Sequence, residues 1–366
     1  MSIEIKKCAV LGAGVMGAQI AGHIANAGIP SLLFDINEEL AQKGVDGLSK
    51  LKPAPLFSSS NKALVTPCTY DNDLEKLSDC DLIIEAVAEK IEIKHAVYKN
   101  LLPHLKKGVI LASNTSGIPL ANLVEVLPED IQKSFLIAHF FNPPRYLKLL
   151  ELVKGENTSE EVYETMTEFG ETTLGKGIVH AKDTPGFIGN RLINAGGPLT
   201  YHKAVEMGLT VEDVDALSGT LVGNAKSAYF RTQDVVGLDT ALNVQNNMFD
   251  RVTTESEEER QKFKAPDMLV KLVEEGRLGQ KSGSGWYKKE GKEILSLDLD
   301  TMEYTPTKKR MFDTIRVGKP IKDLKKRLAA ITYLDDIGAK FLWECNAPMF
   351  TYTANLIPEI ADSIVE

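Results

Sequence analysis

Short apolar runs alternate with stretches of helical periodicity along the first half of the chain, up to about residue 183. Apolar positions at helical spacing predict helices at Val15–Ala27, Ile91–Leu102 and Glu160–Thr172. Runs separated in this way are typical of a parallel sheet with crossover helices, so the predicted fold class is α/β with a doubly wound, mostly parallel sheet. The predicted strands are Cys8–Leu11, Ser31–Phe34, Leu82–Ala86, Val109–Ala112, Phe135–Phe140, Leu147–Val153 and Ile178–Ala181.

The pattern changes after Pro185, where strand-like runs fade and helical periodicity takes over. Gly208, Gly237 and Gly276 punctuate the helical patterns, and a glycine-rich loop at Lys281–Tyr287 follows them. We therefore expect an all-helical second domain over residues 185–290, after a first domain over residues 1–184. The predicted helices are Phe187–Met207, Val211–Leu217, Thr232–Phe249 and Pro266–Glu275.

The segment Leu295–Leu328 has a mixed pattern and is locally basic. We interpret it as a solvated connector, with a site for acidic groups as the alternative. Its basic residues are Lys308, Lys309, Arg310, Lys325, Lys326 and Arg327.

The tail carries a faint echo of the helical region. Pro348, Ala354, Glu359 and Asp362 mirror Pro198, Ala204, Glu212 and Asp215, with the later set three residues tighter. The later set stops where the earlier one continues with further helices. We therefore expect residues 291–366 to be the connector and the start of a second, incomplete helical repeat, with chance similarity as the alternative.

Composition narrows the function classes. The chain has 366 residues, 43% hydrophobic and 25% charged, which is typical of a globular protein of two or three domains. Its net charge of −9 provides no general basic surface for nucleic acid or an anionic membrane, so we expect neither partner.

The four cysteines are Cys8, Cys68, Cys80 and Cys345, and their spacing matches no zinc or disulfide framework. We expect reduced, mostly buried thiols, no metal, and a location in the cytoplasm. We also expect no signal peptide at the N-terminus and no membrane span anywhere in the chain.

A glycine turn follows the first predicted strand directly. It reads Gly12-Ala13-Gly14-Val15-Met16-Gly17, and a predicted helix comes next. Glycines at this spacing permit a tight turn, close approach of a pyrophosphate and close packing of helix on strand, which is the Rossmann-type fingerprint. Asp35 ends the second strand, and its carboxylate would accept the ribose hydroxyls and repel a 2′-phosphate. The first domain is therefore predicted to bind NAD rather than NADP.

His139 is the strongest candidate for catalysis among the six histidines. It ends the apolar run Phe135–Ala138, at the edge of the sheet where α/β proteins bind ligands. Glu151 lies in the next apolar strand, where an unpaired carboxylate would be costly. The two could hydrogen-bond, with His139 as general base and Glu151 orienting it. A purely structural pair is the alternative.

Two polar clusters are further candidates. Ser116 belongs to Ser113–Gly117, directly after a predicted strand, and Asn190 begins the helical domain. Either side chain could reach the substrate oxygen. Turn or capping chemistry explains each of them equally well.

Several of these motifs together resemble the L-3-hydroxyacyl-CoA dehydrogenases of fatty-acid β-oxidation over residues 5–290. The motifs occur in the family's order. They are the glycine turn, Glu85–Glu89, Ser113–Ser116, His139–Pro143, Leu150–Leu152, Asp183–Phe187 with Asn190-Arg191, Val236–Asp239 and Lys281–Tyr287.

The resemblance implies roles for individual residues. It implies His139 as the base with Glu151 as its partner, and Ser116 and Asn190 as ligands of the substrate oxygen. It also implies NAD as cofactor, an acyl-CoA substrate, and a helical domain that forms a homodimer. The cofactor contacts around the nicotinamide half would be Glu89, Lys94, Asn142 and Lys281.

Two departures from the family pattern limit the resemblance. The segment Leu51–Tyr70 is shorter than the family's helical hairpin that helps to bind CoA, so Lys50 and Lys52 are only candidates for that role. The tail after residue 290 resembles variants that continue into a second helical domain and an enoyl-CoA hydratase domain. We therefore expect the front part of such a polypeptide. A dehydrogenase of a small hydroxy acid or sugar acid, and a catalytically silent NAD-binding fragment, remain the rival hypotheses.

Overall fold

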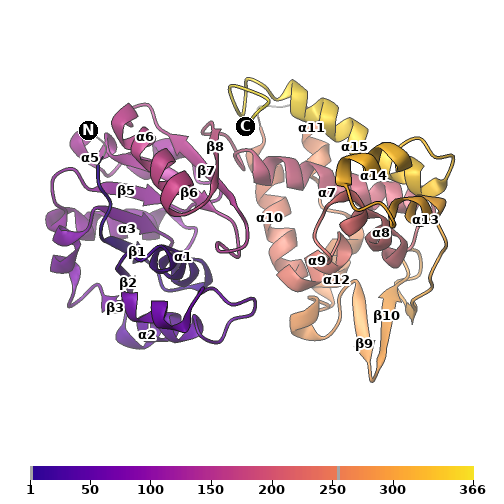
Figure 1. Cartoon of the computed structure of the whole chain (residues 1–366), viewed down its shortest axis with the longest axis horizontal. Coiled ribbons are helices and arrows are strands. Elements are labelled where there is room, and N and C mark those ends of the chain that lie inside the picture. Colours follow the sequence, from indigo (N-terminus) through magenta and orange to yellow (C-terminus); the bar gives the residue numbers. More distant parts are fainter. Residues whose placement is uncertain (1–2, 254–255) are drawn as a thin grey trace. The chain divides into compact units, whose positions relative to one another are not determined.

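The structure is a computed structural model that describes residues 3–253 and 256–366. The chain divides into two compact units, coloured by position along the sequence in Figure 1. Unit 1 contains the chain up to Ile188 together with the tail Leu356–Glu366. Unit 2 is the segment between them, Gly189–Asn355.

Unit 1 is built on an eight-stranded sheet in the order β3-β2-β1-β4-β5-β6-β7-β8. Neighbouring strands are parallel except for β6 and β7, which pair antiparallel. The strands are β1 (Cys8–Leu11), β2 (Ser31–Asp35), β3 (Val65–Thr69), β4 (Leu82–Glu85), β5 (Ile110–Ser113), β6 (Phe135–Phe140), β7 (Leu149–Lys154) and β8 (Gly177–Ala181). The helices are α1 (Val15–Asn26), α2 (Glu38–Gly47), α3 (Ile91–Leu101), α4 (Leu120–Val124), α5 (Glu129–Gln132) and α6 (Glu160–Glu168).

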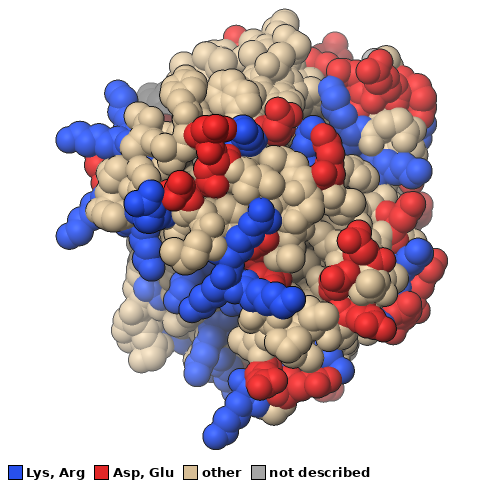
Figure 2. Space-filling model, turned by 90° about the vertical axis from the view of Figure 1, so that its right-hand side faces the viewer, with Lys and Arg blue, Asp and Glu red and all other residues tan. Residues whose placement is uncertain are grey.

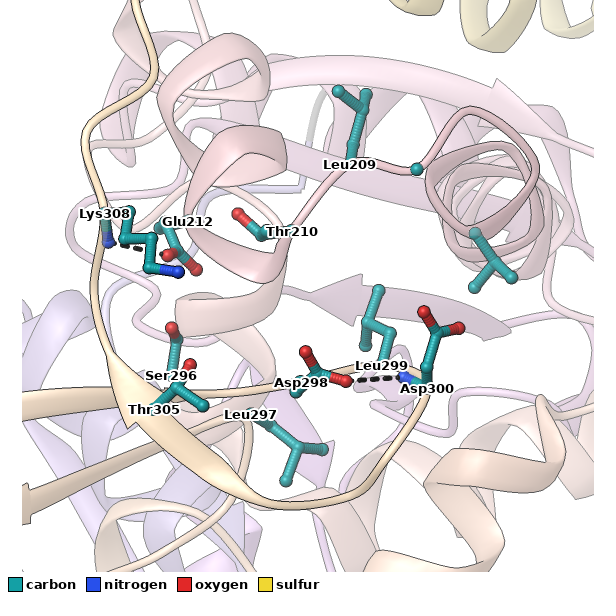
Figure 3. A pocket seen from close by; sticks show the side chains of 12 residues that line it. Leu209, Thr210, Glu212, Ser296, Leu297, Asp298, Leu299, Asp300, Thr305 and Lys308 are labelled. Carbon is teal, nitrogen blue, oxygen red and sulfur yellow. Dashed lines mark hydrogen bonds between the residues drawn. The ribbon is translucent and has the colours of Figure 1, made fainter.

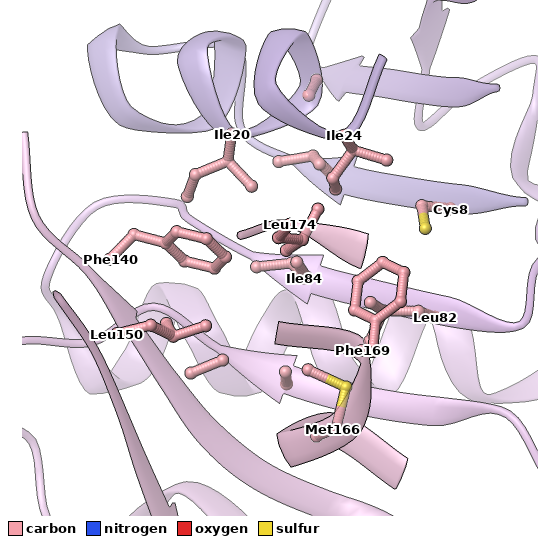
Figure 4. Packing of buried hydrophobic residues seen from close by; sticks show 14 of the residues in the cluster. Cys8, Ile20, Ile24, Leu82, Ile84, Phe140, Leu150, Met166, Phe169 and Leu174 are labelled. Atoms are coloured by element: carbon pink, nitrogen blue, oxygen red, sulfur yellow. The ribbon is translucent and has the colours of Figure 1, made fainter. Parts of the chain in front are cut away.

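The central strands are apolar on both faces because helices cover both. One cluster packs α1 and α6 on the sheet, with Ile20, Ile24, Phe140, Leu150 and Met166 among its members (Figure 4). A second cluster covers the opposite face and includes residues of α3 and α4. Two-sided burial explains why these strands appear in the sequence as continuous apolar runs rather than as alternating patterns.

Helix starts in unit 1 follow local capping chemistry. The Asn37 side chain accepts a hydrogen bond from the Leu40 amide at the start of α2, and the Ser159 side chain accepts one from the Val162 amide at the start of α6. Each cap satisfies an amide that has no partner within its helix, so these polar residues fix where the helices begin.

The tail covers the outer edge of β8. The Lys182 amide donates to the Ile360 carbonyl at 2.9 Å, and the His180 amide donates to a Glu366 carboxylate oxygen at 2.7 Å. An ion pair of 2.7 Å joins Lys182 to Asp362. Edge strands present unpaired backbone groups, and here a segment from the far end of the chain satisfies some of them.

Unit 2 is mainly helical and has a small antiparallel sheet in the order β11-β10-β9. Its core includes Phe230, Leu272, Trp286 and Phe341. The helices are α7 (Gly189–Glu206), α8 (Val211–Ser218), α9 (Phe230–Val236), α10 (Leu238–Arg251), α11 (Glu257–Arg260), α12 (Asp267–Glu274), α13 (Asp313–Gly318), α14 (Leu324–Ile331) and α15 (Ile337–Asn355). The strands are β9 (Tyr287–Glu290), β10 (Glu293–Leu297) and β11 (Tyr304–Pro306).

The predicted fold class is confirmed, because a mostly parallel sheet is followed by a mainly helical part. The edge strand β3 is missing from the sequence prediction, since Pro67 and flanking polar residues hide its pattern. The single helix predicted at Thr232–Phe249 is wrong. Gly237, with φ of 100°, separates two helices there, α9 and α10.

The connector predicted at Leu295–Leu328 is also wrong as a purely solvated segment. It contains part of β10, all of β11 and α13, and most of α14. Leu297 and Phe312 are buried in the unit 2 core with 1% and 2% exposure. The strand β9 is short and mostly charged, and β10 and β11 have only five and three residues, so periodicity gave no clear signal for them.

The predicted repeat in the tail stays a prediction, although the first element of each copy is a helix. The helices α7 and α15 pack on each other, and each contains an internal proline, Pro198 and Pro348. Glu212 and Asp215 lie on α8, whereas their counterparts Glu359 and Asp362 lie in turns that pack with unit 1. The three-part division at residues 184 and 290 stays a prediction.

All four thiols are free, as expected, and Cys8, Cys68 and Cys80 are buried while Cys345 is half-buried. Burial raises the pKa of the Cys80 and Cys345 thiols to about 12, so both are protonated at neutral pH. In the described ranges, 3–253 and 256–366, no helix combines the length and apolar character that crossing a membrane needs.

Candidate active site

His139 and Glu151 form a buried pair in unit 1. They face each other directly in the antiparallel register of β6 and β7, and His139 Nδ1 lies 2.6 Å from Glu151 Oε2. Their exposures are 5% and 0%. Because a carboxylate can only accept, this contact assigns the ring proton to Nδ1 and leaves Nε2 as the acceptor. The second Glu151 oxygen accepts the Ile188 amide at 3.0 Å.

Ser116 is exposed at the end of β5 and is bound by Glu89. One Glu89 oxygen accepts the Ser116 amide at 2.9 Å, the Ser116 hydroxyl at 3.4 Å and the Thr115 hydroxyl at 2.5 Å. Burial raises the pKa of Glu89, but the charge of Lys94 and these hydrogen bonds outweigh it and leave the pKa below its usual value. Glu89 is therefore an ionised clamp that fixes Ser116.

Beneath this clamp lies a fully buried ion pair. The Lys94 ammonium, on α3 and 1% exposed, lies 2.7 Å from a Glu85 oxygen and 3.2 Å from Glu89. Glu85 also accepts hydrogen bonds from the Tyr98 and Ser113 hydroxyls, at 2.9 and 2.6 Å. The network joins β4, β5 and α3, so it supports the carboxyl edge of the sheet.

The glycine turn has the geometry that a dinucleotide needs. A Cβ on Gly17 would come within 1.9 Å of the Gly12 carbonyl oxygen, and a Cβ on Gly12 would come within 2.7 Å of the Ala86 oxygen. A Cβ on Gly14 would meet nothing within 4 Å, so the space above Gly14 is open. Gly14 precedes the first residue of α1, where free amides favour a pyrophosphate.

Asp35 ends β2 next to this turn. One carboxylate oxygen accepts the Ala13 amide at 2.7 Å and the other accepts the Ile36 amide at 2.7 Å. Val15 and Ile36 are exposed by 61% and 65%, and Met16 is partly buried. The acid and the open turn lie on neighbouring strands, β2 and β1, and their residues fit a bound NAD molecule.

Asn142 lies in the turn after β6. Its side-chain oxygen accepts a hydrogen bond from Gln19 on α1 at 3.0 Å. This bond leaves the Asn142 amide group as the donor that a ligand would meet. The Asn114 side-chain oxygen accepts the Phe140 amide at 2.8 Å and so ties the end of β5 to the end of β6.

The remaining candidates lie elsewhere. Asn190 is half-buried on α7 of unit 2, and Lys281 of the same unit forms an ion pair of 2.5 Å with Asp239. Lys50 and Lys52 are exposed after α2 in unit 1. The structure thus brings His139 together with Glu151, and Ser116 together with Glu89 and Lys94.

A small cavity of about 140 Å³ in unit 2 holds none of the predicted residues (Figure 3). Thr210, Glu212, Ser296 and Asp298 line it, among others. On the face drawn in Figure 2, acidic and basic side chains occur together, so that face is not uniformly basic.

The sequence prediction missed Glu85, Tyr98 and Gln19 as parts of the site. Glu85 was detectable, because it ends the apolar strand Leu82–Ile84 and such a carboxylate needs a partner, as Glu151 does. Tyr98 and Gln19 gave no signal, since only the packing of their helices brings them to the site.

Two protein families match the chain, one over each of its two main parts. The family described as "3-hydroxyacyl-CoA dehydrogenase, NAD binding domain" matches residues 7–184. The family described as "3-hydroxyacyl-CoA dehydrogenase, C-terminal domain" matches residues 186–289.

A probable 3-hydroxyacyl-CoA dehydrogenase of Bacillus subtilis is 40% identical over 385 aligned residues, covering 100% of this chain and 48% of the relative. A putative fatty acid oxidation complex trifunctional enzyme of Rickettsia felis is 33% identical, covering 100% of this chain and 51% of its own length. The chain therefore spans about half the length of these two relatives.

The crystal structure of FadB2 from M. tuberculosis is also similar. It superposes with a TM-score of 0.66 at 33% sequence identity, covering 78% of this chain and 99% of that one. The two family matches, their order and this structural similarity agree. The chain belongs to the 3-hydroxyacyl-CoA dehydrogenase family, and its N-terminal part is the family's NAD-binding domain.

Proposed function

We propose that this chain oxidises an L-3-hydroxyacyl-CoA to the 3-ketoacyl-CoA with NAD as the hydride acceptor, as in fatty-acid β-oxidation. The observation that carries the proposal is the buried contact of 2.6 Å between His139 Nδ1 and Glu151. It lies at the carboxyl edge of the sheet that bears the glycine turn, where α/β proteins of this type bind their ligands.

In this proposal His139 is the general base. Its Nε2 accepts the proton of the substrate hydroxyl while the hydride on the same carbon is transferred. Bound NAD would supply the nicotinamide that accepts this hydride. Glu151 holds the ring in the required tautomer and stabilises the imidazolium that forms.

Ser116 and Asn190 would donate hydrogen bonds to the substrate oxygen. Glu89 supports this role for Ser116, because it binds both the amide and the hydroxyl of that residue. Gly12, Gly14, Gly17 and Asp35 would hold the dinucleotide. Asn142 and Lys281 would contact its nicotinamide half, while the buried Lys94 acts through Glu89 as a positioning residue.

The test is steady-state turnover with 3-hydroxybutyryl-CoA and NAD. His139→Ala should lower kcat by about 10³-fold and Glu151→Gln by about 10²-fold, with NAD affinity unchanged. His202→Ala, at an exposed position, is the matched control. Full turnover in His139→Ala with intact NAD binding would refute the assignment.

The wild-type protein separates the rival functions. Oxidation of free 3-hydroxybutyrate alone would favour a dehydrogenase that does not use CoA, and NAD binding without turnover would favour a silent fragment.

The proposal also covers assembly and location. The homodimer through the helical domain is supported by the resemblance alone. The continuation into an enoyl-CoA hydratase is supported by the resemblance and by the longer relatives, one of which is named as a putative trifunctional enzyme. A cytoplasmic location is supported by the free thiols. Sedimentation analysis tests the dimer, since a purely monomeric species at micromolar concentration contradicts it, and cell fractionation tests the location.

A further inference from the structure

The cavity of about 140 Å³ in unit 2 lies between a helix connection and a strand hairpin (Figure 3). One wall is the connection from α7 to α8 and the start of α8, with Thr210 and Glu212. The opposite wall is the hairpin of β10 and β11, with Ser296, Asp298 and Thr305. Because α8 packs on β10, both walls belong to the same folded unit.

Both walls are fixed by their own hydrogen bonds. The Thr210 hydroxyl accepts the Asp213 amide and the Asp213 carboxylate accepts the Thr210 amide, each at 3.3 Å, which sets the start of α8. In the hairpin, Asp298 Oδ1 accepts the amides of Asp300 and Thr301 at 3.0 and 2.9 Å. The cavity is therefore preformed, and a ligand would bind it at little cost in conformational entropy.

Three side chains that line the cavity have oxygens without a hydrogen-bond partner among the described residues. Glu212 Oε1 accepts the Lys308 amide at 2.9 Å, but Glu212 Oε2 is buried and has no partner. Ser296 is only 2% exposed, and no described residue binds its hydroxyl. The bonds to Asp298 all end on Oδ1, which leaves Oδ2 free. Buried acceptors without a donor are costly, so the site favours a ligand that carries N–H donors.

The lining of the cavity carries more negative than positive charge. Glu212, Asp298 and Asp300 line it, whereas Lys308 is the one basic residue of the lining within the described ranges. Hydrogen bonds from Thr301 and Asp300 hold the pKa of Asp298 below its usual value, so this carboxylate is ionised at neutral pH. The cavity therefore favours a cation over an anion.

The rest of the lining indicates which kind of cation fits. In the part of the chain that the structure describes, no three or more His, Cys, Asp or Glu side chains are grouped so that they could hold a metal ion. Val205, Leu209 and Leu297 add apolar surface, which an alkyl chain can contact. An ammonium group brings three N–H donors, one for each of the three free oxygens.

We propose that this cavity binds a small primary alkylammonium ion, with the ammonium on Glu212, Ser296 and Asp298 and the alkyl chain against Leu209 and Leu297. An alkyl chain of about four carbons fits a space of this size. The site goes beyond the proposed function, since it shares no residue with the proposed catalytic and cofactor contacts.

The test is a ligand-observed NMR titration of the full chain with butylammonium chloride at constant ionic strength. A ligand with about five heavy atoms should bind with a dissociation constant of about 1 mM. Glu212→Gln and Ser296→Ala should each weaken binding about tenfold. Glu212→Gln keeps an oxygen for the Lys308 amide. Glu274→Gln, at an exposed position of α12, is the matched loss of a carboxylate and should leave the dissociation constant unchanged.

Two further ligands separate the ammonium from other occupants. Butanol, which has the same chain without the charge, should bind about tenfold more weakly. An equal concentration of Mg²⁺ should not displace butylammonium. Equal binding of butanol, displacement by Mg²⁺, or no butylammonium binding to the wild type would each overturn the proposal. Wild-type affinity in both Glu212→Gln and Ser296→Ala would also overturn it, and thermal unfolding of each variant verifies that the variant is folded.

Discussion

Two buried basic side chains in unit 1, His23 and Lys176, form no ion pair with an acidic side chain in the described part of the chain. His23, on α1, lies 3.1 Å through Nε2 from the Leu174 carbonyl, and its Nδ1 has no partner among the described residues. Lys176, which is 7% exposed, donates to the carbonyls of Pro144 and Leu147. Burial lowers the pKa of His23 to about 4, helped by the charge of Lys176, and burial lowers the pKa of Lys176 to about 8. Because Lys176 binds two carbonyls of the connection after β6, it stabilises the conformation of that connection.

The pKa of His23 predicts a loss of stability in acid. Between about pH 6.5 and 4 the unfolded chain binds a proton at His23 that the folded chain does not, so the free energy of unfolding falls as the pH falls through this window. The contribution is roughly 3 kcal/mol at pH 4. His23→Gln keeps an amide donor for the Leu174 carbonyl and should remove this part of the loss. Urea denaturation at pH 7 and pH 4 measures it.

The exposed His202 provides the control for this experiment. His202→Gln should show the same acid sensitivity as the wild type. An acid sensitivity of His23→Gln that equals the wild type's would contradict the assigned role of His23.

The contacts of some residues could be predicted from the sequence, and those of others could not. The contact of His139 with Glu151 could be expected, because a carboxylate among leucines and a histidine at the end of an apolar run both need explanation. Their catalytic roles remain proposals. Arg145 gave no comparable signal, since its partners Ala54 and Leu56 are distant in sequence and are contacted through backbone carbonyls.

At the scale of elements, the turn between β1 and α1 shows how one glycine spacing serves two purposes. Gly17 lets the helix approach the Gly12 carbonyl, whereas Gly14 leaves open space. The first is a requirement of packing and the second is a requirement of the ligand. The structure therefore separates two roles that the sequence motif combines.

This separation predicts opposite effects for two similar substitutions. Gly14→Ala should fold normally, because its φ of −64° suits any residue and its Cβ meets nothing, yet the Cβ fills the pyrophosphate space. NAD affinity should fall at least tenfold. Gly17→Ala should destabilise the fold itself, because its Cβ would overlap the Gly12 carbonyl oxygen. Thermal unfolding and calorimetric titration with NAD distinguish the two, and full NAD affinity in Gly14→Ala would disprove this interpretation of the turn.

Elements with strong periodicity could be predicted, and short polar ones could not. The apolar runs at β1, β4 and β6 predicted central strands because both faces of those strands are buried. The edge strand β3 carries a proline and β9 is mostly charged, so neither shows the alternation that a strand prediction needs. Their pairing depends on neighbours that are placed by the rest of the fold.

At the scale of the whole molecule, the tail Leu356–Glu366 returns to unit 1 after the chain has formed unit 2. It supplies acceptors for the amides of His180 and Lys182 at the edge of β8. The stability of the sheet edge therefore depends on residues that follow it by more than a hundred positions in the chain.

Removing Leu356–Glu366 should expose this edge. Amide hydrogen exchange at His180 and Lys182 should become at least tenfold faster, and the shortened chain should self-associate, since open edges pair with one another. Asp362→Ala is the control, because it removes only an exposed ion pair and should change neither exchange nor association. Unaltered exchange in the shortened chain would show that the tail does not protect the edge.

This connectivity makes unit 2 an insertion within unit 1, and it sets an order of events during synthesis. A ribosome completes β8 long before it makes the segment that covers it, and all of unit 2 emerges in between. During that interval two nascent chains on one messenger could pair through their open β8 edges. Covering of the β8 edge therefore waits for the synthesis of Gly189–Asn355, and the translation speed through that segment sets how long the edge stays open.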